Sequence, residues 1–258
     1  MSTFNKVFIQ GVISSEPDYQ IDPVLGKVVY LPIKILREDI GREETITLVC
    51  RDADKIVNLV NDVHAGDIFM TNNARLISVN YEKRNDVICP DCGEEYTNRI
   101  AAERTEIEFY DYQILPKGAK LAFNRVFTMG SICSDIISRP LPNGKFYVKY
   151  KLAVGRYGKA RTEQAYDFPF IVSFGREAEN AVEHLEKGRT VLIEGSIQER
   201  QITQKVACNC PKCAAPSTTN RNSIVRELIT SNVTYVKAPL VEETEEEMRA
   251  EVVEKTEE

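Results

Sequence analysis

Two pairs of cysteines occur with identical spacing, Cys89-Pro-Asp-Cys92 and Cys210-Pro-Lys-Cys213. A spacing of two residues lets both thiolates of a pair bind one tetrahedral zinc ion. A structural zinc ion has four protein ligands, so we predict that the pairs meet and share one ion, either within one chain or between two chains. Cys208 would be a substitute ligand. A redox role is disfavoured because the flanking sequence lacks the βαβ pattern of thioredoxin-like proteins.

The composition indicates a globular protein that stays in the cytoplasm. The 258 residues are 43% hydrophobic and 28% charged. No secretion signal precedes the seven cysteines, and no apolar run is long enough for a membrane segment. Cys50 and Cys133 fall on or near predicted strands, as small core residues do. With two histidines and no phosphate loop, HExxH motif or motif with paired carboxylates, the chain is not expected to be an enzyme.

The cysteine pairs belong to an internal repeat. Phe4-Asn-Lys-Val-Phe-Ile-Gln-Gly11 recurs as Phe123-Asn-Arg-Val-Phe-Thr-Met-Gly130 after 119 positions. Gly66 is matched by Gly188 after 122 positions, and the cysteine pairs recur after 121. Because these offsets are nearly constant, we predict one domain of about 120 residues that is present twice.

The chain therefore divides into three parts. We place the first domain, here the first repeat, at residues 1–118 and the second repeat at 119–238, with the boundary near the turn-forming Pro116-Lys-Gly118. Residues 239–258 form an acidic tail without aromatic residues, for which we expect disorder. The first 240 residues are near neutral, with 31 Lys plus Arg against 30 Asp plus Glu. The tail either keeps the chain soluble or contacts partner proteins.

Each repeat shows the same order of predicted elements, namely three strands, one helix and two strands. In the first repeat the third strand covers Thr45–Cys50 and the helix covers 53–63, because apolar residues recur there at helical spacing. The last two strands cover 67–79 and 106–115, and the cysteine pair lies in an insertion between them. The order is that of the five-stranded OB-fold barrel. We therefore predict an all-β protein of two tandem OB-fold barrels, each with one helix and a CxxC-bearing insertion between its last two strands.

The second repeat resembles the bacterial single-stranded DNA-binding protein family in three stretches. They are Phe123-Asn-Arg-Val-Phe127, Ile171-Val-Ser-Phe-Gly-Arg-Glu-Ala-Glu-Asn180 and Leu185-Glu-Lys-Gly-Arg-Thr-Val-Leu-Ile-Glu-Gly-Ser-Ile-Gln-Glu-Arg200. The first repeat looks like a diverged relative, with Cys50-Arg51 in place of Phe-Gly. The resemblance implies a module that binds single-stranded DNA without sequence specificity and catalyses no reaction.

The sequence departs from that family in three ways. It carries two domains in one chain, it has no tryptophan for base stacking, and its tail ends in Glu257-Glu258 without the family's Pro-Phe tip. We interpret these departures as favouring a version from a phage, plasmid or other mobile element. Contact of the tail with replication or recombination proteins is therefore a hypothesis.

Binding of single strands needs cations for the phosphates and flat side chains for the bases. The resemblance maps base-stacking positions onto Tyr157, Phe168 and Phe174. Tyr157 lies in a polar loop that also contains three cations, Arg156, Lys159 and Arg161. Phe168 and Phe174 alternate with a third phenylalanine, and a strand face of this kind fits a core as well as a binding surface.

Independent of the resemblance, the second strand of the second repeat has two different faces. One is apolar, and the other is basic and aromatic, with Tyr147, Lys149 and Lys151. The outer face of these strands is the usual OB-fold binding surface, although a solvated polar face has the same pattern. Lys6 and Arg125, at equivalent strand starts, are further cationic candidates. In the first repeat Tyr81 is the stacking candidate, and we expect that repeat to bind weakly.

Two functions follow from these observations. The first is a protein that coats single-stranded DNA in replication, recombination or conjugative transfer, as a monomer or an oligomer. The alternative is a scaffold or accessory subunit of such a complex whose OB-folds mainly bind protein. The near-neutral body and the first repeat, which is poor in aromatic residues, favour this alternative.

Overall fold

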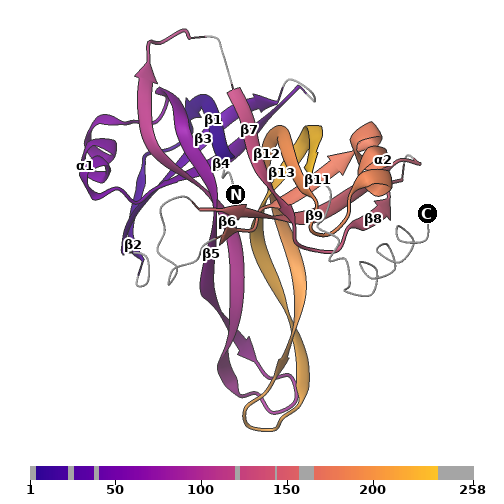
Figure 1. The fold of residues 1–258 in the computed structure, drawn as a ribbon. Helices are drawn as coiled ribbons and strands as arrows, with labels where there is room; N and C mark the ends of the chain where they lie inside the picture. The colour runs from indigo at the N-terminus through magenta and orange to yellow at the C-terminus, as the bar shows by residue number, and fades with distance from the viewer. Residues whose placement is uncertain are drawn as a thin grey trace, which may run out of the picture.

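The structure is a computed structural model and describes residues 4–22, 26–37, 41–119, 123–142, 144–156 and 166–237. Thirteen strands and two helices of ten residues each make up this part of the chain (Figure 1). None of the helices described has the length and apolar character that a membrane crossing requires. The acidic tail and the loop that carries Tyr157, Lys159 and Arg161 lie outside the described residues.

The first repeat supplies six strands and one helix, which is one short strand, β2, more than predicted. Its elements are β1 (Phe4–Ile13), β2 (Asp18–Asp22), β3 (Gly26–Arg37), β4 (Arg42–Cys50), α1 (Ala53–Asp62), β5 (Ile68–Ile88) and β6 (Glu95–Leu115). β1 pairs with β5 and also with β3, so the path β1–β5–β6–β4–β3 closes on itself as a five-stranded barrel. The helix follows the third barrel strand, β4, as predicted.

The second repeat forms a second barrel by the same rule. Its elements are β7 (Phe123–Ile132), β8 (Ile137–Pro140), β9 (Phe146–Gly155), β10 (Tyr166–Asp167), β11 (Phe170–Phe174), α2 (Gly175–His184), β12 (Thr190–Asn209) and β13 (Pro216–Lys237). The path β7–β12–β13–β11–β9 closes through the pairing of β7 with β9. The prediction of two OB-fold barrels is thereby confirmed.

Each barrel encloses the apolar face of its strands. Val148, Tyr150 and Leu152 of β9 are at most 1% exposed, as the alternation of this strand predicted. In the helices, Ile56 and Leu59 of α1 are buried against the core. Asp52 caps α1 by accepting a hydrogen bond from the N–H of Asp54 at 3.1 Å.

The two barrels join through an antiparallel pair of their first strands, β1 and β7. Val7 lies opposite Val126, its own counterpart in the repeat, and the pairing runs symmetrically from Phe4 opposite Met129 to Gln10 opposite Phe123. A pseudo-twofold axis therefore passes between Val7 and Val126. One continuous sheet runs through both barrels as a result.

The last two strands of each repeat are longer than predicted. Strands expected to end at Val79 and Arg200 continue to Ile88 and Asn209, so the expected insertions are strand extensions. Here called arms, these two hairpins run side by side away from the barrels, purple and orange in Figure 1. Beyond the barrel, one face of β5 is half-buried and the opposite face is exposed, and polar residues occur on both faces. Such weak patterning hid these strands from sequence analysis.

The predicted third strand of the second repeat is also divided. Pro169 has no N–H to donate to a strand ladder, and it separates β10 from β11. Phe168 consequently lies outside β11, and the strand begins at Phe170.

Candidate nucleic-acid interface and metal site

The outer face of the second barrel carries three aromatic rings, of Tyr147, Phe170 and Phe174. In the β9–β11 pair, Phe174 lies opposite Tyr147 and Phe170 opposite Lys151, so these side chains share one face. The rings of Tyr147 and Phe174 are 6.1 Å apart, and Phe174 is 43% exposed. Tyr147 is half-buried, and two neighbouring rings at a surface can stack on successive bases of a single strand.

Cations surround these rings. The ammonium groups of Lys149 and Lys151 lie 4.1 and 4.6 Å from the ring centre of Phe170. Lys149 is 2.7 Å from Glu227, and Lys151 is 2.7 Å from Glu103 of the first repeat. The face is therefore cationic and aromatic, but each lysine also contacts a carboxylate of the protein.

Glu227 organises this face. Its side chain is only 4% exposed and accepts hydrogen bonds from Lys149 and from Arg200, the latter at 2.8 Å. Burial disfavours the charged form of Glu227, but the hydrogen bonds from Arg200 and Lys149 outweigh burial and lower its pKa. The carboxylate thereby holds both cations in place. Sequence analysis missed the roles of Glu227 and Arg200. It placed Phe170 on the same strand face as Phe174 by alternation, but it did not predict that Phe170 lies beneath the two lysines.

Arg156 and Phe168 lie at the junction of the two repeats. Arg156 forms a buried ion pair with Asp167 and donates to the carbonyl of Ser78 in the first repeat at 3.0 Å. Phe168 donates its backbone N–H to the hydroxyl of Ser78 at 2.7 Å, and its ring is 6.5 Å from that of Tyr166. These two predicted binding residues are therefore apart from the pair of Tyr147 and Phe174. Whether they contact nucleic acid stays a prediction.

The corresponding face of the first barrel is built from other side chains. Glu106 is 1% exposed and pairs with Arg51 and Arg104. Arg104 also donates to the hydroxyl of Tyr30 at 3.2 Å and lies 4.9 Å above the ring of Tyr81. The predicted stacking residue Tyr81 thus already has a cation over its ring.

Lys6 and Arg125 are both exposed on the central β1–β7 pair. Lys6 lies 3.4 Å from the side-chain oxygen of Asn73. Between the two cations, the rings of Phe8 and Phe127 meet edge to face across the pseudo-twofold axis at 6.0 Å. The structure therefore places both predicted cations at the dyad and away from the rings of Tyr147 and Phe174.

The tips of the two arms bring the four predicted thiols together within one chain. The Sγ atoms of Cys89 and Cys213 are 3.6 Å apart, and those of Cys92 and Cys210 are 3.7 Å apart. All four lie within 4.8 Å of one another. Four sulfurs at a Zn–S distance of about 2.3 Å in a tetrahedron would be about 3.8 Å apart, so the cluster fits a metal ion. Cys208 is buried nearby but is not part of this group.

Matching turns position both cysteine pairs. The N–H of Gly93 donates to the carbonyl of Cys89 at 2.9 Å, and the N–H of Ala214 donates to the carbonyl of Cys210 at 2.9 Å. Gly93 and Ala214 both have positive φ, 71° and 58°. Backbone hydrogen bonds, the strongest from Cys213, lower the pKa of the Cys210 thiol to about 7, whereas hydrogen bonds among the clustered thiols raise the pKa of Cys92 and Cys213.

Comparison with known proteins finds likeness over part of the sequence. Residues 123–210 match the Single-strand binding protein family. Single-stranded DNA-binding protein 2 of Staphylococcus aureus is 34% identical over 83 residues, which are 32% of this chain and 60% of that protein. Single-stranded DNA-binding protein of Thermotoga maritima is 35% identical over 82 residues, which are 31% and 58%. The chain therefore spans about 60% of the length of these curated relatives.

The likeness in fold extends over both halves. The wild-type single-stranded DNA binding protein from Thermus aquaticus matches 95% of this chain and 99% of its own, with a TM-score of 0.61 and 17% identity. At that identity the match shows the fold alone. In sequence, the likeness to the Single-strand binding protein family is confined to residues 123–210.

Proposed function

We propose that the protein binds single-stranded DNA without sequence specificity, mainly on the outer face of the second barrel. The observation that carries this proposal is the exposed ring of Phe174, which lies next to the half-buried ring of Tyr147 and on the same face as Lys149 and Lys151. Stacking is tolerant of sequence because every base has a flat face, and it contributes about 1–3 kcal/mol per base. Tyr157, Lys159 and Arg161 would add a stacking ring and two cations from the loop beyond β9.

Within this proposal, Arg156 and Phe168 position that loop, because their contacts to Asp167 and Ser78 fix both of its ends. Coating of single strands would serve replication, recombination or conjugative transfer. The acidic tail is repelled by DNA because both are negatively charged. It would therefore contact partner proteins. The relatives carry the name single-stranded DNA-binding protein, which supports the proposed ligand.

Anisotropy titration tests the proposed ligand and its location. Labelled oligo-dT and a duplex of equal length are titrated at low and at physiological salt with the wild type, Phe174→Ala and Val182→Ala. Val182 is a matched control, because it is 53% exposed on α2, away from the aromatic face. We expect preference for oligo-dT, weakening with salt, and about 5- to 150-fold weaker binding by Phe174→Ala alone.

Equal affinity for oligo-dT and duplex, or equal loss in both variants, would contradict the proposal. The scaffold alternative would then lead, and co-purification of the tagged chain with replication proteins would be its test. The first barrel favours that alternative locally, since Glu106 engages two of its cations, Arg51 and Arg104.

We further propose that the four-cysteine cluster holds one structural zinc ion per chain. A tetrahedral set of four sulfurs is typical of zinc or of iron–sulfur centres, and the paired CxxC turns are the arrangement of structural zinc sites. Bound zinc would cross-link the arm tips, because Cys89 and Cys92 come from one arm and Cys210 and Cys213 from the other. Ala214 has a φ of 58°, a backbone conformation that is unfavourable for residues other than glycine. A metal ion bound to Cys210 and Cys213 would stabilise the turn in this conformation.

Elemental analysis of the purified chain tests this site. We expect one equivalent of zinc in the wild type and in Cys208→Ser, and none after all four clustered cysteines are changed to serine. Unchanged zinc in the quadruple variant, or iron in the wild type, would contradict the proposed ion and its ligands.

A further inference from the structure

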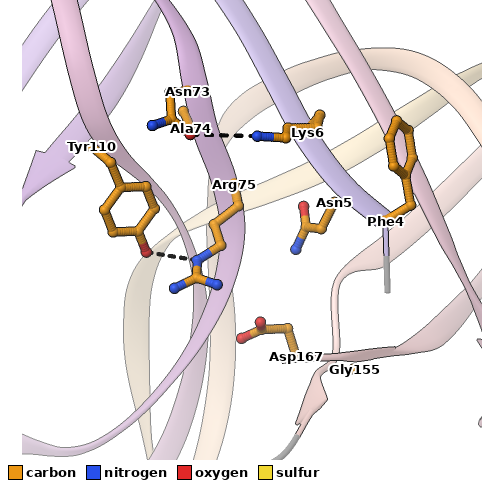
Figure 2. A pocket seen from close by; sticks show the side chains of 9 residues that line it. All are labelled: Phe4, Asn5, Lys6, Asn73, Ala74, Arg75, Tyr110, Gly155 and Asp167. Atoms are coloured by element: carbon orange, nitrogen blue, oxygen red, sulfur yellow. Dashed lines mark hydrogen bonds between the residues drawn. The ribbon is translucent and has the colours of Figure 1, made fainter. Parts of the chain in front are cut away.

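A pocket of about 310 Å³ lies where the first barrel meets the second (Figure 2). Its walls come from both repeats: Phe4, Asn5, Lys6, Asn73, Ala74, Arg75 and Tyr110 from the first, and Gly155 and Asp167 from the second. Its polar lining includes the cations Lys6 and Arg75. The aromatic rings of Phe4 and Tyr110 line it as well.

Arg75 is held in place from one side only. Its Nε donates to the hydroxyl of Tyr110 at 2.6 Å, and its guanidinium lies 4.8 Å from the centre of that ring. The hydroxyl of Tyr110 in turn donates to Glu108. Burial and the nearby Glu108 raise the pKa of Tyr110, so the hydroxyl keeps its proton. Within the described residues the terminal amino groups of Arg75 have no hydrogen-bond acceptor, and they are available to a ligand in the pocket.

The other charged groups leave the pocket cationic. Asp167 is 1% exposed, and Arg156 neutralises it through an ion pair. Lys6 is exposed and has only a long contact of 3.4 Å to Asn73. The ring of Phe4, beside Lys6, is 41% exposed.

The second repeat shows that the barrel does not require this arrangement. Strand register makes Ser196 and Ser231 the counterparts of Arg75 and Tyr110, and it makes Glu194 the counterpart of Asn73. Two serines and a glutamate support the same fold without a cation or a ring. The fold therefore does not require the pair of Arg75 and Tyr110, and binding of a ligand would explain why these two residues are present.

We infer that this pocket binds one nucleotide of a single strand whose other nucleotides lie on the second barrel. Lys6 and the terminal amino groups of Arg75 bind the phosphate, and the ring of Phe4 stacks on the base. The inference rests on the proposed function. Tyr147 and Gly155 lie eight residues apart on the same face of β9, which is about 26 Å of strand. Only a strand of several nucleotides reaches from the aromatic face to the pocket.

Length dependence of binding tests the pocket. Oligo-dT of about 4 and about 20 nucleotides, at the lower limit of and beyond the roughly 4–16 that one OB-fold covers, is titrated in parallel, because an extended strand of four nucleotides is shorter than the roughly 26 Å between Tyr147 and Gly155. The variants are Arg75→Ser, which installs the residue of the second repeat, and Phe4→Ala. Their matched controls are Lys205→Ser, an exposed cation on β12, and Phe123→Ala, the counterpart of Phe4 with 39% exposure.

We expect both pocket variants to bind the long oligonucleotide about tenfold more weakly and the short one with wild-type affinity. Arg75→Ser should also lower the slope of log affinity against log salt by about 0.7, the value for one lost phosphate contact on a single strand. Both controls should differ from the wild type by less than about twofold, and unfolding midpoints identify any variant that misfolds.

The outcomes separate the two proposals. If the wild type binds neither oligonucleotide, the proposed function fails. If it binds both and Phe4→Ala loses no more affinity than Phe123→Ala, the pocket inference is overturned while the function stands. Equal weakening of the short and long oligonucleotides by Arg75→Ser would also overturn it, because a pocket beyond the aromatic face cannot affect a strand that does not reach it.

Discussion

The two barrels share their buried framework. Each barrel closes through a pairing of its first strand, β1 with β3 and β7 with β9. Each also has a buried glutamate on its last strand, which is β6 in the first barrel and β13 in the second. Glu106 and Glu227 occupy equivalent positions, and two cations hold each of them. The carboxylate with two cations is therefore a feature of the fold that both repeats retain.

The barrels differ in the side chains that project around this framework. Strand register places Tyr147 and Phe174 of the second barrel where the first has Val28 and Arg51, so the sequence alignment of Phe174 with Cys50 was wrong by one position. Val28 is 1% exposed and offers no ring. The same backbone thus carries an aromatic face in one repeat and an ion-paired face in the other. The side chains of the outer face can therefore change between repeats while the fold is retained.

The largest effect that would test this difference comes from removing the rings of both Tyr147 and Phe174. Tyr147→Ala combined with Phe174→Ala should weaken binding of oligo-dT by about 2–6 kcal/mol, because two bases lose stacking partners worth about 1–3 kcal/mol each. Tyr30→Ala combined with Tyr81→Ala in the first barrel is the matched control, with an expected loss below about 1 kcal/mol. Anisotropy titration of both double variants measures the contrast, and a larger loss in the first barrel would reverse it.

A second contrast concerns stability. A Cβ atom on Gly195 would lie 2.1 Å from the carbonyl oxygen of Ile229, whereas the equivalent Ala74 is accommodated in the first barrel. Because a backbone oxygen cannot move aside cheaply, Gly195→Ala should lower the free energy of unfolding by about 3 kcal/mol. Ala74→Gly should cost about 1 kcal/mol through lost burial and added chain entropy. Chemical denaturation measures both, and a tolerated Gly195→Ala would show that the two barrels accept the same side chain at this position.

Glu227→Gln separates stability from binding. The pKa of Glu227 is lowered in the folded state, so its charge stabilises the fold above the unfolded pKa of about 4.3, and this contribution is lost as pH falls through the folded pKa. At pH 7 the variant should be about 2 kcal/mol less stable, and its unfolding midpoint should fall less on acidification than that of the wild type.

The same variant should bind oligo-dT several-fold more tightly at low salt, because Lys149 and Arg200 keep their charge and lose a competing carboxylate. Glu106→Gln is the counterpart in the first barrel, and it should lower stability without this gain. Weaker binding by Glu227→Gln, measured by titration at matched folded fraction, would show that the carboxylate serves mainly to orient the two cations.

The sequence was sufficient for the barrels because their signals are local and repeated. Apolar alternation in β9, helical spacing in α1 and the constant offset of the cysteine pairs each predict an element or a contact that the structure contains. The length of the arms could not be predicted in this way. Their outer halves have no core to enclose, so polar residues occupy both faces and the period of two is weak.

The sequence predicted which residues lie on the outer face of the second barrel, but it did not predict which side chains contact them. Alternation located Tyr147, Lys149 and Lys151 on the outer face, but Glu103 and Glu227 meet these lysines from strands that lie far away in sequence. Arg75 and Tyr110 are 35 positions apart and share no motif with known binding sites. Contacts of this kind depend on strand register, which a β-bulge or an inserted residue shifts by one position.

The smallest expected effect compares the two cations at the dyad. Lys6→Gln and Arg125→Gln each remove one exposed charge at equivalent positions of β1 and β7. If only the first lines a nucleotide site, Lys6→Gln should weaken binding of long oligo-dT by about 1 kcal/mol and lower the salt slope by about 0.7, the value for one phosphate contact. Arg125→Gln should change the slope by less than half as much, since Glu194 and Ser196 stand where the pocket has Asn73 and Arg75. Titration over a series of salt concentrations measures both slopes. Equal slopes would mean that the strand crosses the dyad symmetrically and that the two barrels are more alike toward DNA than their outer faces indicate.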